Sequence, residues 1–418
     1  MREARVRQGY TESRIAAAKH FGHEFMMTMP PSAQMPFPLA TRAAALEMLQ
    51  AFLPKAGADY AQWRNYDFGP GQHTRVSALS PYIRHRLITE EEVVRGVLTQ
   101  HSPEAAEKFI QEVYWRTYWK GWLEMRPSVW ADYLADLDQL GPPNAEAQAA
   151  MAGRTGIACF DNWAAELVET GYLHNHARMW FASIWIFTLR LPWQWGADFF
   201  LQQLLDGDPA SNTLSWRWVA GLQTPGKTYL ATPENIATFT QGRFQPEAIL
   251  HGPAPEGPAN PPAQALPAVP KLPDASFLLL LTEEDLHAES LALRAGQIAG
   301  LAGLAPSRDG LSPNVAAFRN AALADGLMRA ADHFGQGAPV LDAGALLDHA
   351  RGLGLTNIVT AYAPVGPIAS QLAAFAQQAA TQGLALHYVQ RAWDRAAWPL
   401  ATKGFFPFRQ HIPSLLPK

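Results

Sequence analysis

A tract rich in proline and alanine, over residues 246–273, divides this sequence into two parts with different patterns. The tract contains few side chains that a protein core would bury, so it is predicted to be a partly extended linker. Segments before the tract have the apolar spacing of helices, whereas those after it alternate between strand-length and helix-length runs. The sequence therefore predicts a lead-in over residues 1–38, a helical domain over 39–245, the linker, and an α/β domain over 274–418.

The helical part carries recognisable helix boundaries. Thr41 is a suitable N-cap and Pro54 a stop for the first helix, and Thr89 with Glu92 forms a capping-box pattern for the second. Glycine and proline separate the later helical patterns from one another. The expected helices span residues 41–53, 89–99, 103–125, 159–171, 174–190 and 194–206.

Beyond the linker, continuous apolar runs of strand length alternate with helical patterns. The predicted strands span residues 277–282, 356–362 and 384–390, and the helices between them span 289–303, 315–332, 343–353 and 367–381. Buried strands joined by crossover helices predict a Rossmann-like α/β domain with a parallel sheet. Neither a GxGxxG nor a P-loop sequence occurs in this part, so no motif indicates a nucleotide site there.

Residues 172–219 combine polar and aromatic side chains in one stretch. Its polar residues are His174, Asn175, Arg178, Asp206, Asp208 and Asn212, and its tryptophans are Trp180, Trp185, Trp193, Trp195, Trp216 and Trp218. Polar groups in an apolar setting are costly to bury unless each one has a partner. A heteroaromatic cofactor with amide edges would supply such partners, so the stretch predicts a flavin pocket. Ordinary aromatic packing in a helical core is the alternative for most of the fourteen tryptophans.

A second aromatic segment lies in the predicted helix over residues 103–125. Glu112, Trp115, Arg116 and Trp119 are spaced three and four residues apart, so they share one helix face or its flanks. The tryptophans alone would form a core stripe, and Glu112 with Arg116 would form a surface ion pair. The spacing itself does not separate these explanations from a functional site.

Composition excludes several classes of protein. The single cysteine, Cys159, excludes a disulfide framework, a cysteine-ligated zinc site and an all-cysteine iron–sulfur cluster within the chain, and no metal is expected. A net charge of −4 indicates that any nucleic-acid binding must use a local basic groove. We recognise no signal peptide or transmembrane span and therefore expect a cytoplasmic protein without membrane contact. A monomer is expected.

Several motifs resemble those of the FAD-binding domain of the cryptochrome/photolyase family, in the family's order over residues 60–245. They are Tyr60, VSALS over 76–80, ExxWR at Glu112, Trp115 and Arg116, GYLHNxxRM over 171–179, LDGDxAxN over 205–212, and WxW over 216–218. The α/β part looks like the family's antenna domain, and residues 400–415 are similar to its closing segment. That domain precedes the FAD domain in the usual family order, so this chain resembles a circular permutation.

The resemblance implies FAD as the cofactor and a set of residues that hold it. Loop residues would hold its phosphate, Arg178 would pair with Asp206 over the isoalloxazine, and Asp206 and Asp208 would face the polar edge of the ring. Asn212 would lie at flavin N5, where an amide is similar to the family's repair enzymes. The implied cofactor-binding set is Tyr60, Ser77, Leu79, Ser80, Glu112, Arg116, Asn175, Arg178, Asp206, Asp208 and Asn212.

The same resemblance implies blue-light-driven repair of cyclobutane pyrimidine dimers in DNA, the activity of a deoxyribodipyrimidine photo-lyase. Glu112 and Asn175 match positions that hydrogen-bond the dimer, and Trp115, Met179 and Trp218 match its apolar walls. The electron would come from excited reduced FAD, so the protein supplies binding and orientation. The family's other repair chemistry uses a histidine pair where this chain has Asn175 and Met179, which favours the cyclobutane type.

The chain also departs from the family pattern. Ala78 stands where the phosphate loop usually has an arginine, for which His73, Arg75 or Arg84 could compensate. Trp216 and Trp193 match the inner two members of the tryptophan electron-transfer chain. The outermost member has no counterpart, and Trp185, Trp195 and Trp130 are the candidates. In the DNA-facing groove the implied residues are Arg64, His176, which replaces an arginine, and Lys227 nearby.

These departures leave a second hypothesis, a cryptochrome-like flavin photoreceptor without repair activity. The acidic balance, the altered groove and the rearranged domains favour it. The sequence also leaves open whether the α/β domain holds a second, antenna chromophore or has a structural role alone.

Overall fold

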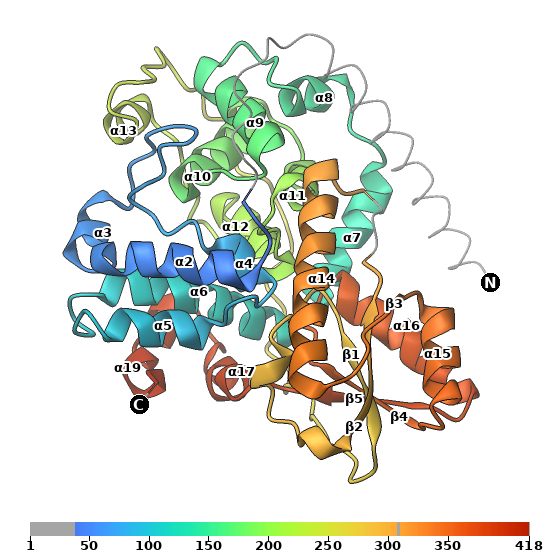
Figure 1. Ribbon diagram of the computed structural model, residues 1–418. Coiled ribbons are helices and arrows are strands. Elements are labelled where there is room, and N and C mark those ends of the chain that lie inside the picture. The colour runs from blue at the N-terminus through green and yellow to red at the C-terminus, as the bar shows by residue number, and fades with distance from the viewer. Residues whose placement is uncertain (1–37, 307–309, 418) are drawn as a thin grey trace.

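The computed structural model describes residues 38–306 and 310–417. The predicted lead-in over residues 1–38 lies outside the described residues except for its last position. The first part of the described chain is helical (Figure 1). Its helices are α2 (Arg42–Phe52), α3 (Ala58–Trp63), α4 (Ser80–Arg84), α5 (Glu90–Leu98), α6 (Glu107–Glu124), α7 (Ser128–Leu140), α8 (Ala145–Met151), α9 (Ala158–Thr170), α10 (Asn175–Ser183), α11 (Trp193–Gln203), α12 (Pro209–Val219) and α13 (Pro233–Phe239).

Side-chain caps fix several of these boundaries. The Thr41 side chain accepts a hydrogen bond from the backbone N–H of Ala44, and Thr89 and Glu92 form the predicted capping box. Gly171 ends α9 in the left-handed conformation that glycine adopts without steric cost. The predicted start of α6 at residue 103 is wrong, because residues 103–106 form a turn before the helix begins at Glu107.

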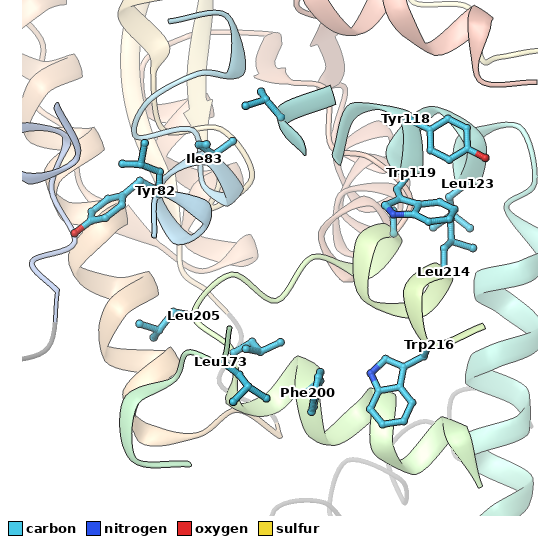
Figure 2. Close-up of a cluster of buried hydrophobic side chains, with 14 of the residues drawn as sticks. Tyr82, Ile83, Tyr118, Trp119, Leu123, Leu173, Phe200, Leu205, Leu214 and Trp216 are labelled. Atoms are coloured by element: carbon cyan, nitrogen blue, oxygen red, sulfur yellow. The ribbon is translucent and has the colours of Figure 1, made fainter. Parts of the chain in front are cut away.

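The long helix α6 packs against α12 at the centre of the helical part. Figure 2 shows Trp119 and Leu123 of α6 near Leu214 of α12, with Trp216 further along α12. All four side chains are buried. Of the predicted flavin residues, Glu112 and Arg116 lie on α6 and Asn212 lies on α12, so this packed pair fixes their backbone positions.

The second part is a five-stranded parallel sheet with helices beside it. The strand order is β3-β2-β1-β4-β5. The chain therefore adds β2 and β3 on one side of β1 and then β4 and β5 on its other side, so the strand order reverses between β1 and β4. This confirms the predicted α/β class. The elements are β1 (Phe277–Leu281), β2 (Ile298–Leu304), α14 (Pro313–Phe334), β3 (Val340–Leu341), α15 (Ala343–Gly352), β4 (Asn357–Ala361), α16 (Pro367–Thr381), β5 (Ala385–Val389), α17 (Ala392–Ala397), α18 (Phe405–Arg409) and α19 (Ile412–Leu415).

The helix predicted over residues 289–303 is wrong, because its second half is strand β2. The sequence IAGLAGL has helix-forming alanine and leucine, but its glycines allow close packing on a sheet. A side chain at Gly303 would come within 2.6 Å of Leu327 on α14, and one at Gly300 within 2.5 Å of Leu353. Tertiary packing therefore overrides the local preference. The sequence pattern also misses the two-residue strand β3, which is too short to show a period.

The two parts are joined along α6. Residues 246–273 form no helix or strand, and in this tract the Gln264 N–H donates to the Met125 carbonyl at the end of α6 (2.9 Å). The carboxyl-terminal helices α17 and α18 also pack on α6 (Figure 1). There the Tyr114 hydroxyl donates to the Leu415 carbonyl (2.9 Å) and the Tyr118 hydroxyl to the Lys403 carbonyl (2.8 Å). Within the described residues, no helix is long and apolar enough to cross a membrane.

Candidate functional site

The turn between α11 and α12 brings together the acidic residues of the predicted flavin pocket. Asp206 and Asp208 flank Gly207, and both carboxylates are buried. The Arg178 guanidinium pairs with Asp206 at 3.0 Å, and Asp208 caps α12 by accepting from the Ser211 N–H at 2.7 Å. The expected pairing of Arg178 with Asp206 is present. The turn therefore holds two carboxylates in fixed positions inside the protein.

Three cations surround Asp208. Its carboxylate lies 3.6 Å from Arg116, 3.6 Å from Lys120 and 3.9 Å from Arg84. Although burial opposes ionisation, these cations hold the pKa of Asp208 well below its usual range. The sequence motifs miss Lys120, although it follows Arg116 by four residues on the same helix face.

Several buried polar atoms around this turn have no hydrogen-bond partner. They are Asp206 Oδ1, Ser211 Oγ and Arg116 Nη1, the last of which has only its ion-pair contact with Asp208 at 3.6 Å. Buried polar atoms are rarely left unpaired, and a group of them indicates a ligand or ordered water. Donors and acceptors of this kind fit the amide edge and hydroxyl chain of FAD. Residues that could hold the cofactor here are Arg116, Arg178, Asp206, Asp208 and Ser211.

The loop predicted to hold phosphate lies directly before α4. Ala78 adopts a left-handed conformation (φ 50°), and the Leu79 N–H lies 3.4 Å from Ser77 Oγ. Arg84, the last residue of α4, donates from its Nε to the Gly207 carbonyl at 2.9 Å, which connects the helix after this loop to the acidic turn. The left-handed conformation of Ala78 is uncommon for a residue other than glycine. The loop is therefore held in a specific shape next to the turn.

Each residue proposed to compensate for the missing arginine at Ala78 is paired with a carboxylate. His73 Nε2 lies 2.8 Å from Glu166, and Arg75 lies 3.0 Å from Asp59. Arg84 pairs with a third carboxylate, that of Glu284. None of these three side chains is therefore a free cation.

Two further residues of the predicted pocket lie on α10 and α12. The Asn212 amide N–H donates to the Ala197 carbonyl at 2.8 Å, which directs the amide oxygen away from that carbonyl. The Asn175 amide lies 4.0 Å from the Met179 sulfur, and Asn175 is exposed. Asn212 therefore has the fixed orientation of a core residue, whereas Asn175 and Met179 are accessible to a ligand from solution.

A second cluster contains Tyr60, Arg64 and Glu112. The Arg64 guanidinium pairs with the Glu112 carboxylate, and the backbone N–H of Arg64 donates to the Tyr60 carbonyl at 2.9 Å. Burial raises the pKa of Glu112 and that of Tyr60, whereas the charge of Arg64 opposes both shifts. Glu112 is thus paired across to the end of α3 rather than with Arg116 on its own helix. The surface ion pair considered for Glu112 and Arg116 is not what the structure shows.

The two tryptophans predicted to wall the lesion pocket are both partly covered. Phe405 of α18 stacks on Trp115 with ring centroids 3.6 Å apart and planes 12° apart. Trp218 stacks on Tyr229 at 5.6 Å. Trp115 and Trp218 remain half-buried, so each offers limited ring surface to a ligand. The sequence does not predict Phe405 as a site residue, because it is distant in the chain.

The predicted DNA-binding residues differ in what they can do. Arg64 is already paired with Glu112, and His176 hydrogen-bonds the Asn65 carbonyl (2.8 Å) and the Tyr229 hydroxyl (3.2 Å). Burial lowers the pKa of His176, so its ring is neutral at pH 7 and does not attract phosphate. Lys227 lies in an exposed loop. Of these residues, Lys227 alone has an exposed charge without an ion pair among the described residues.

The aromatic residues of the predicted electron path continue in two directions. Trp216 meets the edge of Trp185 at 6.3 Å. Trp193 stacks on Tyr133 at 5.6 Å, and Tyr133 lies 5.2 Å from Trp130. Of the three candidates for the outer member, Trp130 is therefore the one connected to Trp193 through another aromatic ring.

A cavity of about 430 Å³ lies away from this site, in the α/β part. The linker and the carboxyl ends of β4 and β5 line it. Its lining includes Lys271, Tyr362, Tyr388, Gln390, Arg395 and Trp398. The indole Nε1 of Trp398 is buried without a hydrogen-bond partner. A second ligand of the α/β part would have space here.

Part of the chain is similar to known proteins. Residues 109–247 match the family model of the FAD binding domain of DNA photolyase. The deoxyribodipyrimidine photo-lyase of Streptomyces griseus is 33% identical over 182 residues, which are 43% of this chain and 39% of that protein. A deoxyribodipyrimidine photo-lyase of Thermus thermophilus is 34% identical over 206 residues, 47% of this chain and 46% of that protein.

Among solved structures, a bacterial class III photolyase from Agrobacterium tumefaciens aligns with 26% identity and a TM-score of 0.41. The alignment covers 48% of this chain and 43% of that one. The chain thus spans less than half the length of the relatives it matches.

Proposed function

We propose that this protein is an FAD-dependent, blue-light-driven repair enzyme for cyclobutane pyrimidine dimers in DNA, because part of its helical region is similar to the FAD binding domain of DNA photolyase. The observation that carries the proposal is the group of buried polar atoms without hydrogen bonds around Asp206 and Asp208, inside the segment matched to the FAD binding domain. When bound, FAD would supply the light-driven electron. Side chains of the protein would bind and orient the cofactor and the lesion.

The protein's residues would hold the cofactor in a fixed electrostatic setting. Arg178 and Asp206 form a pair at the turn, and the three cations around Asp208 keep that carboxylate ionised. Asn212, fixed by Ala197, would offer its amide oxygen to the ring. Because these groups are positioned before the cofactor binds, little reorganisation accompanies charge transfer.

Glu112, Asn175 and Met179 would contact the flipped lesion, with Trp115 and Trp218 as apolar surfaces. The exposure of Asn175 and the partial exposure of Met179 support this assignment. Glu112 would have to exchange its pairing with Arg64 for a hydrogen bond to a base. Arg64 would then be available to a DNA phosphate, which couples lesion binding to backbone binding.

A flavin photoreceptor without repair activity is the second candidate. The Arg64–Glu112 pair and the stacking of Phe405 on Trp115 favour it, because both occupy groups that a repair enzyme would present to DNA. The neutral ring of His176 favours it as well.

The test is repair of a thymine dimer in an oligonucleotide by the photoreduced protein under blue light. Recovery of intact thymines, with tighter binding of damaged than undamaged DNA at low salt, is the expected result. If the protein binds FAD but shows neither, the repair proposal is wrong and the photoreceptor remains. A protein purified without any capacity to bind FAD would contradict both.

We also propose that the domain order is permuted relative to the family, with the α/β domain (274–418) after the helical one (39–245). The parallel sheet and the linker without helix or strand support this. A rearranged chain with 274–418 placed first should still bind FAD, because the contacts along α6 do not depend on chain order. Failure of the rearranged chain to fold would count against the proposal.

A further inference from the structure

The carboxyl end of β1 lies at the point where the strand order reverses, which is where open α/β sheets commonly bind ligands. In this protein the segment Thr282–Asp285 at that point is buried. Its acidic side chains meet arginines of the helical part or of nearby helices. The pairs are Arg84–Glu284 (2.6 Å), Arg86–Asp285 (3.3 Å), Arg391–Asp285 (2.6 Å) and Arg319–Glu283 (2.8 Å). The reversal point is therefore occupied by the helical part itself.

Arg84 connects this interface to the flavin turn. Its guanidinium donates two hydrogen bonds to Glu284, at 2.6 and 2.7 Å, and its Nε donates to the Gly207 carbonyl at 2.9 Å. Gly207 lies between Asp206 and Asp208. Arg84 and Glu284 are only 2% and 5% exposed, so solvent does not screen the pair. Because the planar guanidinium of Arg84 is hydrogen-bonded to Glu284 through its terminal nitrogens and to Gly207 through Nε, its orientation is fixed.

Glu284 also balances the charge at the turn. Arg84, Arg116 and Lys120 all lie within 4 Å of the Asp208 carboxylate. The single negative charge of Asp208 cannot neutralise these three positive charges alone. Glu284 provides the additional negative charge for Arg84, and it comes from the α/β part. Without it, Arg84 would be attracted toward Asp208 and away from the geometry that places its Nε on Gly207.

We propose that Glu284 is a positioning residue for the flavin site, which acts through Arg84 to hold the Asp206–Asp208 turn. The α/β domain would then be part of the cofactor site, and not a separate module. This inference rests on the proposed function, because the turn is a flavin site only if the protein binds FAD.

The test uses the full chain and two readouts: the dissociation constant of FAD, from fluorescence quenching, and the visible absorption spectrum at saturating FAD. Glu284→Gln is expected to weaken FAD binding roughly tenfold, the scale on which loss of a supporting partner weakens a ligand site. The resolved fine structure of the flavin band should also be lost. The matched control is Asp394→Asn, which removes another buried acid of the interface, paired with Arg86 at 2.8 Å.

A second variant covers the case in which Glu284→Gln does not fold. Arg84→Met with Glu284→Leu removes both charges together, so no unpaired buried charge remains. It is expected to fold and to show the same loss of affinity and fine structure, because Gly207 has lost its donor. Wild-type affinity and spectrum in this double variant would overturn the inference. An equal spectral change in Asp394→Asn would also overturn it, because the effect would then belong to the whole interface. A wild-type protein that does not bind FAD would instead refute the proposed function.

Discussion

The guanidinium of Arg64, the residue that follows α3, pairs with the carboxylate of Glu112 on α6, so the predicted phosphate contact and the predicted lesion contact neutralise each other. Both side chains are about one-third exposed, at 29% and 34%. A solvent-accessible pair of this kind contributes little to folding and can be exchanged for other partners. The pair is therefore suited to open when DNA binds.

Arg64→Met should raise the pKa of Glu112 further. Burial already raises this pKa, and the charge of Arg64 is the largest opposing influence. The protonated carboxyl should therefore persist to higher pH, as measured by its infrared carbonyl band across a pH series. Arg351→Met, which breaks the exposed Arg351–Asp348 pair, is the control. An unchanged Glu112 band in Arg64→Met would show that the pair does not control the titration.

Glu112→Ala should lower the yield of dimer repair while FAD remains bound. Glu112 lies on the Tyr60 and Arg64 side of the site, apart from the turn that would hold the flavin ring. Repair yield per absorbed photon and flavin content, both measured on the same sample, separate the two effects. Loss of the flavin from this variant would instead place Glu112 in the cofactor site.

Arg243→Met should destabilise the folded protein on the order of 3 kcal/mol, because it leaves the fully buried carboxylate of Asp67 without its cation. Arg243 lies 2.6 Å from Asp67, which also accepts hydrogen bonds from Trp163 Nε1 and the Gly69 N–H. Urea unfolding gives the change in free energy. Adding Asp67→Asn to this variant should recover part of the loss. No recovery in the double variant would mean that the buried charge is not the cause.

His174→Asn should flatten the dependence of stability on pH. Burial lowers the pKa of His174 to about 3, whereas an unfolded histidine titrates near 6.5. Below about pH 6.5 the unfolded state therefore binds a proton that the folded state does not. The free energy of unfolding consequently falls as pH falls toward 3, by about 1.4 kcal/mol per pH unit for this group.

His174 is the N-cap of α10 and accepts from the His176 N–H, and asparagine is also a good N-cap. The variant should therefore keep its stability at pH 7.5 and lose less of it at pH 5. The exposed His411, changed to Asn, is the control. Identical pH slopes in wild type and His174→Asn would contradict the assignment.

Trp130→Phe should slow photoreduction of the bound flavin, if the aromatic contacts from Trp193 through Tyr133 carry electrons. The rate is measured by flavin bleaching under blue light with an external reductant. Trp195→Phe is the comparison, because Trp195 is an equal candidate in the sequence and its indole N–H donates to the Gly141 carbonyl. A slower rate in Trp195→Phe alone would reverse the assignment.

Sequence patterns predict the elements whose signals are local. Thr89 and Glu92 reveal a capping box, and the apolar run at Phe277–Leu281 reveals a central strand. Strand β2 is not predicted, because its conformation depends on packing against Leu327 and Leu353, which are distant in sequence. The pairing of Arg178 with Asp206 could be predicted because the motifs that contain these residues resemble those of a known family.

Contacts that depend on three-dimensional proximity do not appear in the sequence. Nothing near Arg84 indicates that its partner is Glu284, two hundred residues later. The stacking of Phe405 on Trp115 cannot be predicted from the sequence either. Contacts of this kind join residues far apart in the sequence, and a local motif cannot predict them.

The packing of Phe405 and Leu415 against α6 has a consequence for biosynthesis. Tyr114 and its partner carbonyl at Leu415 are separated by 301 residues. During translation α6 therefore emerges from the ribosome long before the segment that covers Trp115 and Tyr114. Until then its aromatic face is exposed to solvent and to chaperones. The nascent helical part is thus expected to need protection from aggregation while the rest of the chain is synthesised.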